Sequence, residues 1–488
     1  MFPTVSEEGS VGVYRVPRDQ SSVVLGLDLG TTSISCVALS GDGQQLVVLS
    51  EPHRAEIAGL AAGRREQNPA IIRTAAWRLL KKLTDGLPRN SHVIGIGVTG
   101  QMHGTILLDA EYQPMSYLIT WQDQRAVQAL PDGSSSFRNL QKRISPEWQT
   151  GTGCRISPGY LGTTVNCLQE TGEWPDACRI VCTIADWVVS QLRQAAPCTD
   201  RSNAASTGLY DLKQDTWQTD LLNATRTKAA WLPPVKASGC VLGTMSDDVA
   251  DITGLPTSAF VCNAIGDHQA AVLSALPDVG SNLLINIGTG GQIAWRIPNF
   301  RTVEGMDTRY LPSLSANPGG PSHSFMLVGA GLVGGEALAW VNRTIGTWLS
   351  AFGVELSEEQ IWERLHEQLQ NSPDTDSPLK CEPYFSGTRP APQRRAVFSN
   401  VSSTNFTPAS VARSVYSGIA ASMREFLNIA GPAAPRPIEQ ICLSGNGARR
   451  NPFLQAAFQK QFSVPVTVCG FREEAATGAA LLALRNLP

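Results

Sequence analysis

The stretch that decides the fold occurs twice in this chain. Residues 25–34 read LGLDLGTTSI, and residues 283–293 read LLINIGTGGQI. In each copy an apolar strand carries one polar residue near its end, Asp28 or Asn286, and continues into a Gly-Thr turn and a second strand. The two copies stand about half a chain apart. Because internal repeats reveal architecture, a duplicated α/β domain is the simplest account, with a boundary near residues 245–262.

The remaining pattern agrees with this fold class. A helical stretch near residues 69–83 and an apolar strand at 93–98 follow the first copy, and alternating strands and helices indicate an α/β architecture. We divide the chain into a loose N-terminal extension (1–22), a first domain (23–258) and a second domain (259–488).

A capping box predicts one further helix. Ser357 is followed three residues later by Gln360, the pattern in which each side chain bonds the backbone N–H of the other residue. Ile361, Leu365 and Leu369 then fall on one face of the helix. We interpret this helix as structural.

Composition excludes several classes of protein. The chain has 488 residues, 42% of them apolar, with 39 basic against 42 acidic side chains and a net charge of −3. This balance argues against a nucleic acid or a charged membrane surface as partner. No run of about 18 apolar residues predicts a membrane span, and the polar N-terminal stretch does not read as a secretory signal. Scattered cysteines, 11 in all, favour reduced thiols. We expect a cytoplasmic protein.

The two Gly-Thr turns are candidates for binding phosphate. Small residues let the backbone approach a ligand closely, and successive N–H groups then form a nest for an anion. Either turn alone is explained by a tight hairpin, but the repetition favours paired loops around the β- and γ-phosphates of a nucleotide. A P-loop is excluded because the chain has no Gly-Lys dipeptide. The candidates are Gly30, Thr31, Thr32 and Ser33 in the first turn, and Gly288, Thr289 and Gly290 in the second.

Two aspartates stand where phosphoryl transfer needs carboxylates. Asp28 ends an apolar strand, where an isolated carboxylate is costly unless a cation pairs with it. Magnesium, often through water, is one such partner; the alternative is an aspartate that caps its own turn. Asp267 follows a strand at the start of a helix, so it is either a plain cap or a general base that accepts a hydroxyl proton. Its place near the domain boundary favours the base.

Two more glycine-rich stretches are open to different interpretations. Gly329, Gly331 and Gly334 match GxGxxG, and Glu355 lies near the distance expected for a ribose-binding acid of an NAD site. The alternative is a helix start that approaches adenosine or phosphate. Residues 444–451, SGNGARRN, can admit a base or ribose, or can be an ordinary loop. Their candidates are Gly445, Asn446, Gly447 and Asn451.

Polar residues in the first half suggest a polyhydroxylated ligand. Neutral and acidic groups beside an aromatic ring supply the hydrogen bonds and the apolar platform that such a ligand needs. His103 taken alone is more typical of a hydrogen-bonded core residue. No Ser-His-Asp or Cys-His context predicts a hydrolase. The candidates are Gln101, Met102, His103, Trp121, Asp123 and Asp186.

Taken in order over residues 23–485, these motifs resemble the FGGY family of carbohydrate kinases. Each motif is weak alone, but the ordered set is specific. The resemblance implies an actin-like (ribonuclease H-like) α/β fold, with two duplicated domains around a central cleft. The matching elements are GLDLGTTS (26–33), EQNP (66–69), GQMHG (100–104), Gly266-Asp267, NIGTG (286–290), 329–340, YFSGTR (384–389), 444–451 and EAATGAA (474–480).

The resemblance also implies an activity and roles for the candidates. The expected reaction is ATP-dependent phosphorylation of a terminal primary hydroxyl of a ketose. A seven-carbon sugar is preferred, and a five-carbon one is the alternative. Asp267 would be the base in contact with the sugar, and Asp28 would hold Mg²⁺. The Gly-Thr turns would bind phosphate, the later glycine-rich stretches would line adenosine, and the polar cluster would hold the sugar. A non-catalytic actin-like ATP-binding protein is the alternative of another class. The oligomeric state stays open between monomer and homodimer.

Overall fold

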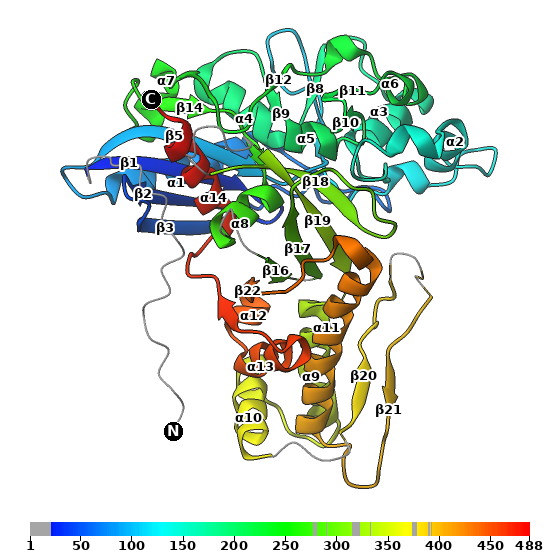
Figure 1. Ribbon diagram of the computed structural model, residues 1–488. Coiled ribbons are helices and arrows are strands. Elements are labelled where there is room, and N and C mark those ends of the chain that lie inside the picture. The colour runs from blue at the N-terminus through cyan, green and yellow to red at the C-terminus, as the bar shows by residue number, and fades with distance from the viewer. Residues whose placement is uncertain are drawn as a thin grey trace.

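The computed structural model describes residues 21–276, 281–288, 290–314, 323–331, 333–372, 378–388, 391 and 393–488. Thr289, Arg389 and the first twenty residues of the predicted extension lie outside the described residues. Figure 1 shows two halves, one above the other, each built around a β-sheet. The fold is the expected two-domain α/β architecture.

The first half contains a sheet in the order β13-β14-β5-β1-β2-β3, with β15 on β5. β1 is antiparallel to β2 and parallel to β5. The strands of this sheet are β1 (Ser22–Leu29), β2 (Ser33–Ser40), β3 (Gln45–Pro52), β5 (His92–Gly100), β13 (Val241–Thr244), β14 (Phe260–Cys262) and β15 (Ile265–Gly266). Short ribbons pair β4 (Glu66–Gln67) with β7 (Leu118–Ile119), β6 (Ile106–Leu108) with β8 (Ile180–Cys182), β9 (Thr199–Asp200) with β12 (Val235–Lys236), and β10 (Tyr210–Asp211) with β11 (Thr216–Trp217). The helices are α1 (Pro69–Asp85), α2 (Ser136–Arg143), α3 (Leu161–Glu170), α4 (Ile184–Arg193), α5 (Arg201–Ser206), α6 (Thr219–Ala224) and α7 (Asp247–Thr253).

The second half contains a sheet in the order β18-β19-β17-β16-β22-β23. Its strands are β16 (Asn282–Ile287), β17 (Gly291–Ile297), β18 (Asp307–Pro312), β19 (His323–Gly331), β22 (Gln440–Ser444) and β23 (Val466–Val468), and β20 (Lys380–Glu382) pairs separately with β21 (Val397–Ser399). The helices are α8 (Asp267–Ala275), α9 (Gly335–Ala351), α10 (Glu358–Asn371), α11 (Pro408–Ala430), α12 (Asn446–Arg449), α13 (Pro452–Phe462) and α14 (Glu474–Asn486).

The two sheets repeat one topology. The run β3-β2-β1-β5-β14 corresponds to β19-β17-β16-β22-β23, with antiparallel pairing up to the central strand and parallel pairing after it. Asp28 on β1 lies opposite Ser35, and Asn286 on β16 lies opposite Gln292. The duplication predicted from the sequence repeat is confirmed.

The dinucleotide-binding interpretation of the GxGxxG stretch is wrong. That fingerprint needs a strand of a βαβ unit, whose strands are parallel. Here Gly329 and Gly331 lie on β19, which is antiparallel to both of its neighbours, β17 and β18. Only the helix start remains from that prediction, since α9 begins at Gly335.

Helices α8 and α14 join the halves. α14 closes the chain yet lies against β1, β2 and β5 of the first sheet (Figure 1). Glycines allow this approach: a Cβ on Gly26 would lie 1.9 Å from the Ala476 carbonyl oxygen, and one on Gly478 would lie 1.7 Å from that of Ala270. β14 and β15, which follow residue 258, also lie in the first sheet. The division between residues 258 and 259 stays a prediction.

Local signals in the sequence place two helices correctly. α1 starts where Asn68 accepts hydrogen bonds from Ala70 and Ile71 N–H, and α10 starts at the predicted Ser357–Gln360 capping box. Its apolar face, Ile361, Leu365 and Leu369, is buried. Among the residues that the structure describes, no helix combines the length and apolar character needed to cross a bilayer.

Candidate active site between the two halves

The first Gly-Thr loop, residues 30–32, is held by side chains from other segments. Gln67 Nε2 donates to the Thr31 carbonyl oxygen at 2.6 Å, and His53 Nε2 lies 2.9 Å from the same oxygen. The Trp121 indole N–H donates to the Thr31 hydroxyl at 3.1 Å. The loop is therefore preformed, and its hydroxyl is linked to an aromatic ring.

The turn itself requires a residue without a side chain. A Cβ on Gly30 would lie 2.9 Å from the Ser33 carbonyl oxygen, closer than real Cβ atoms come. On the far side of the turn, His53 N–H donates to the Thr32 carbonyl at 3.2 Å. The first loop thus has the compact backbone expected of a phosphate-binding turn.

The second loop meets the start of α9. Gly335 N–H donates to the Gly288 carbonyl at 2.7 Å. A Cβ on Gly334 would lie 2.3 Å from the Gly290 carbonyl carbon, and one on Gly290 would lie 2.8 Å from the Gly331 carbonyl oxygen. Because these backbone segments lie too close together to leave room for a Cβ, both glycine-rich stretches need glycine at these positions. The structure brings Gly288, Gly290 and Gly331 together.

The third glycine-rich stretch joins the same cluster. Gly445 has a φ of +84°, and a Cβ on it would lie 2.5 Å from the Ile287 carbonyl oxygen. A Cβ on Gly447 would lie 2.9 Å from the Ile287 side chain and 3.3 Å from Leu338 of α9. Asn446 begins α12, and Asn451 caps α13 by accepting from Leu454 N–H at 3.0 Å. The end of β16, the start of α9 and this stretch therefore form one backbone-rich corner.

Two carboxylates stand at the end of the first sheet. β5 pairs with β1 on one side, where Thr99 lies opposite Asp28, and with β15 on the other, where Gly100 lies opposite Gly266. Asp267 follows Gly266 directly and opens α8. The two aspartates therefore reach the same edge from strands on either side of β5.

The surroundings of the two carboxylates differ. Burial raises the pKa of Asp28 well above its ordinary value, and the charges of Asp267 and Glu473 raise it further. Oδ1 of Asp28 is buried without a hydrogen-bond partner among the described residues. Burial also raises the pKa of Asp267, to about 6, although the His268 N–H and the charge of Arg309 oppose that rise.

The donor set around Asp28 fits a hard cation. A buried carboxylate oxygen without a partner, beside other negative charges, gains most from a bound divalent ion. The described residues contain no group of three or more His, Cys, Asp or Glu side chains placed to hold a metal. An ion at Asp28 would therefore take its remaining oxygens from phosphates and water.

Asp267 is held in place through its backbone. Gly266 N–H donates to the Ser202 hydroxyl at 2.8 Å, and that hydroxyl donates to the Asp200 carboxylate at 2.7 Å and 2.8 Å. Thr99 donates to the Ile265 carbonyl at 2.7 Å. The two residues that precede the candidate base, Ile265 and Gly266, are thus each fixed by a hydrogen bond.

Three predicted sugar ligands follow β5 directly. Gln101 donates to Gln67 Oε1 at 2.9 Å, and its own Oε1 is buried without a partner among the described residues. Met102 lies against Gly266, where a Cβ would come within 2.7 Å of its sulfur. His103 has a φ of +72°, and its ring stacks on Tyr160 at 4.1 Å. The structure brings all three close to the residues around Asp267.

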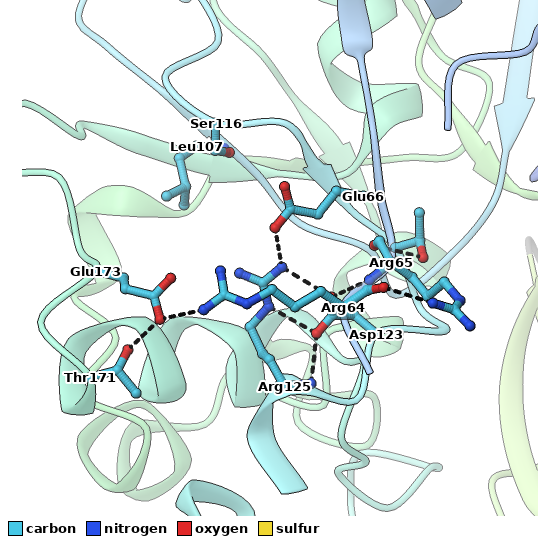
Figure 2. A network of polar contacts seen from close by, with 10 residues as sticks. Arg64, Arg65, Glu66, Leu107, Ser116, Asp123, Arg125, Thr171 and Glu173 are labelled. Carbon is cyan, nitrogen blue, oxygen red and sulfur yellow. Dashed lines mark hydrogen bonds and ion pairs between the residues drawn. The ribbon is translucent and has the colours of Figure 1, made fainter. Parts of the chain in front are cut away.

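Trp121 and Asp123 lie on one loop but have different surroundings. Trp121 is 44% exposed, whereas Asp123 is 1% exposed. Figure 2 shows the Asp123 carboxylate accepting hydrogen bonds from the Arg125 side chain and from the Arg65 backbone N–H, while Arg125 also pairs with Glu66. The carboxylate of Asp123 is therefore buried and already hydrogen-bonded, whereas the nearby Trp121 side chain is exposed.

Two other candidates have contacts away from the loops. Asp186 is 1% exposed and forms a capping box with Thr183 at the start of α4, and burial raises its pKa to about 7. Gly329 faces α11, since a Cβ on it would lie 2.4 Å from the Phe426 ring. None of these contacts reaches the Gly-Thr loops, so the roles predicted for Asp186 and Gly329 stay predictions.

Sequence reasoning missed several residues of the site. His268 and Gln67 stand inside motifs that were recognised, next to Asp267 and Asn68, and their position was the available signal. Tyr160 and Arg309 stand in stretches without a motif. Glu473 precedes α14, and it accepts a hydrogen bond from Ser35 of the first sheet at 2.6 Å.

The two halves also enclose a cavity of about 990 Å³. Tyr160 lines it from the first half, and Asp307 and Gly331 line it from the second. Of the candidate site residues, Gly331 lines this cavity. Duplicated α/β domains with glycine-rich turns at their strand ends are the arrangement expected of a phosphotransferase.

Comparison with known proteins identifies the family. Residues 23–274 match the N-terminal domain of the FGGY family of carbohydrate kinases, and residues 286–487 match its C-terminal domain. The chain therefore belongs to the FGGY family and is a carbohydrate kinase. Kinases of this family use ATP and a sugar as their substrates.

Individual relatives cover almost the whole chain. Human sedoheptulokinase is 27% identical over 95% of this chain and 98% of its own length. Xylulose kinase from Klebsiella pneumoniae is 26% identical over 87% of this chain and 82% of its own length.

Solved structures share the fold. Xylulose kinase from Rhodospirillum rubrum has a TM-score of 0.81 at 22% identity, with 94% of this chain and 89% of that one covered. Glycerol kinase from Plasmodium falciparum, solved with ADP, has a TM-score of 0.78 at 19% identity, covering 95% and 89%. The predicted fold class is confirmed.

Proposed function

We propose that this protein transfers the γ-phosphoryl group of ATP to a terminal primary hydroxyl of a ketose, with sedoheptulose as the preferred sugar. The observation that carries the proposal is the position of Asp267. It stands at the edge of the first sheet, one strand away from the Asp28 loop, and it has a pKa of about 6 caused by burial. A carboxylate of this kind suits a general base near neutral pH.

The proposed reaction divides the work among the residues of the site. Asp267 accepts the proton of the sugar hydroxyl while that oxygen attacks the γ-phosphorus, and ADP leaves. The turns that contain Thr31, Thr32 and Gly288 hold the phosphates through backbone N–H groups and hydroxyls. Gly331, Gly445 and Gly447 are proposed to line adenosine, since they belong to a corner where backbone segments lie close together.

Magnesium belongs to the proposal at Asp28. When bound, the ion neutralises charge on the transferring phosphate oxygens. Asp28 contributes a carboxylate oxygen that has no hydrogen-bond partner in the described part of the chain. Phosphoryl transfer depends mainly on alignment and charge neutralisation, and the residues named here serve those two needs.

The sugar is proposed to lie between Trp121 and the end of β5. Trp121 offers an exposed ring as a platform, and Gln101, Met102 and His103 line the strand end. The match to sedoheptulokinase over nearly the full length of both chains favours a seven-carbon ketose. Xylulose is the rival substrate, since the xylulose kinases are also matched over most of their length.

A panel of sugars tests the substrate. Release of ADP is measured with ATP, Mg²⁺ and each of sedoheptulose, xylulose, glycerol and gluconate. The proposal expects the highest kcat/KM with sedoheptulose. A higher value with xylulose overturns the substrate assignment, and the absence of any sugar-dependent ADP release favours a non-catalytic ATP-binding protein.

Asp267→Asn tests the base. The amide keeps the shape of the side chain but cannot accept a proton, so turnover is expected to fall on the order of 10²- to 10⁴-fold. ATP binding, measured by calorimetry, is expected to persist. Turnover close to the unsubstituted level would remove Asp267 from the proposed mechanism.

A further inference from the structure

His268, the residue after the proposed base, is held by an arginine from β18. Arg309 Nη1 lies 3.2 Å from His268 Nδ1, and Arg309 Nη2 lies 3.1 Å from the Asp307 carboxylate. His268 is 9% exposed, and the Arg309 side chain is 12% exposed. His268 N–H also donates to Asp267 Oδ1 at 2.7 Å. The imidazole is thus held through Nδ1, and the backbone of His268 is held by the Asp267 carboxylate.

The chemistry of this contact selects one form of the ring. A guanidinium has donors and no acceptor, so a hydrogen bond between it and Nδ1 requires that nitrogen to accept. The proton of a neutral imidazole then resides on Nε2. Burial lowers the pKa of His268 well below its usual value, and the charge of Arg309 lowers it further. No hydrogen bond between described residues is recorded for Nε2.

The ring lies next to residues of the proposed sugar site. His268 lies in the first turn of α8, directly after Asp267. His103, whose ring stacks on Tyr160, is close enough for its charge to lower the pKa of His268. Arg309 comes from β18, which lies against α8. The pair is anchored further where Thr308 N–H donates to the Gly153 carbonyl at 2.7 Å.

We propose that Arg309 is a positioning residue that fixes His268 as a neutral Nε2–H donor to a second hydroxyl of the sugar. This inference rests on the proposed function. Asp267 takes the proton of the reacting hydroxyl, and His268 orients the sugar by donating to a neighbouring oxygen. Arg309 acts only through His268 and the strand that carries it.

The tautomer is tested first, without reference to activity. Nitrogen NMR of the full chain, labelled with ¹⁵N-histidine, reports the protonated nitrogen of each of the 6 histidines, and His268→Gln assigns the signal. We expect an Nε2–H signal that becomes a mixture of tautomers in Arg309→Met. An Nδ1–H signal, or a signal unchanged in Arg309→Met, overturns the proposal.

Kinetics then test the connection to the sugar. Arg309→Met is expected to raise the KM for the sugar on the order of tenfold and to leave the KM for ATP unchanged. Arg309→Gln keeps a donor for Nδ1 and is expected to recover most of the loss. In the His268→Ala background Arg309→Met is expected to add nothing, because the two residues act as one unit.

Controls separate this role from a structural one. Arg343→Met removes an exposed arginine paired with Glu336 and is expected to change no kinetic constant. If Arg309→Met lowers the unfolding midpoint but Arg309→Gln does not restore the sugar KM, the positioning role is excluded. If no sugar is phosphorylated at all, the proposed function fails, and the NMR result still decides the state of His268.

Discussion

Asp28 and Asp267 show how neighbouring carboxylates come to have different environments. Asp267 receives the His268 N–H and lies near the positive charge of Arg309, so these contacts limit the rise in its pKa. Asp28 has no such support, and the charges of Asp267 and Glu473 raise its pKa beyond the effect of burial. A cation at Asp28 would displace a proton that is otherwise favoured there, so its binding is expected to strengthen with pH.

The pH profile follows from the base. Because burial raises the pKa of Asp267 to about 6, and only the ionised carboxylate accepts a proton, kcat/KM for the sugar should fall as the pH drops through about 6. The constant is measured between about pH 5 and 8 at saturating ATP, since it reports groups of the sugar-free enzyme. The residual activity of Asp267→Asn should not show this fall in kcat/KM at low pH. If kcat/KM instead fell only near pH 4, the pKa of the base would be that of an ordinary aspartate.

Asp123 is expected to affect stability more than sugar binding. Its carboxylate accepts from Arg125 and from Arg65 N–H, so Asp123→Asn leaves a buried arginine short of a partner. Breaking a buried ion pair costs about 3 kcal/mol or more. Urea unfolding and the sugar KM are compared with the exposed variant Asp132→Asn. A large rise in KM with unchanged stability would make Asp123 a sugar ligand instead.

At the scale of elements, the site depends on how closely α14 and α8 approach each other and the first sheet. Gly26 and Gly97 on the sheet face α14 backbone, and Gly478 of α14 faces α8 backbone. Bare backbone at these places lets the helices carry Asp267 and Glu473 up to the ends of β1 and β5. The glycine of the EAATGAA motif, Gly478, thus serves packing, and the placement of Asp267 and Glu473 follows from it.

Gly478→Ala tests this packing. In an isolated helix the change would stabilise by about 1 kcal/mol, but here the new Cβ would lie 1.7 Å from the Ala270 carbonyl oxygen. Overpacking against backbone should dominate and destabilise the protein by about 3 kcal/mol, measured by urea unfolding. Gly470→Ala is the matched control, since nothing lies within 4 Å of a Cβ there. If Gly478→Ala instead raised the free energy of unfolding, α14 and α8 would be able to move apart and accommodate the new Cβ.

The sequence predicts those features that are written locally. The repeat places Asp28 and Asn286 at equivalent strand ends, and the Ser357–Gln360 box places a helix start, because both signals lie within a few residues. The contacts of Tyr160 with His103 and of Arg309 with His268 join segments far apart in the chain. Residue types and spacing carry no record of such pairs, and the same is true of the hydrogen bond from the Arg65 backbone N–H to Asp123.

At the scale of the whole molecule, the halves share elements. α14 lies near the end of the sequence but buries Ala476, Ala480 and Ala483 against Val24 and Val37 of the first sheet. α8 and the same helix also pack under the second sheet. Two units joined in this manner should unfold together, and closing on a nucleotide would move them as bodies hinged near these helices.

Calorimetry tests this cooperativity. Leu25→Ala in the first core and Leu443→Ala in the second each remove a buried side chain and should each cost about 2 to 5 kcal/mol. Both variants are expected to move one common transition to lower temperature. Two resolved transitions, each shifted by only one of the variants, would show that the halves melt independently.

The place of α14 also has a consequence for biosynthesis. The strands it covers precede α14 by several hundred residues, so they leave the ribosome well before their partner does. At about 5–20 residues per second, the nascent first sheet waits roughly 20 to 90 s with one apolar face uncovered. During translation that face is a natural substrate for chaperones. A chain that terminates early would keep it exposed, which marks the truncated product for degradation.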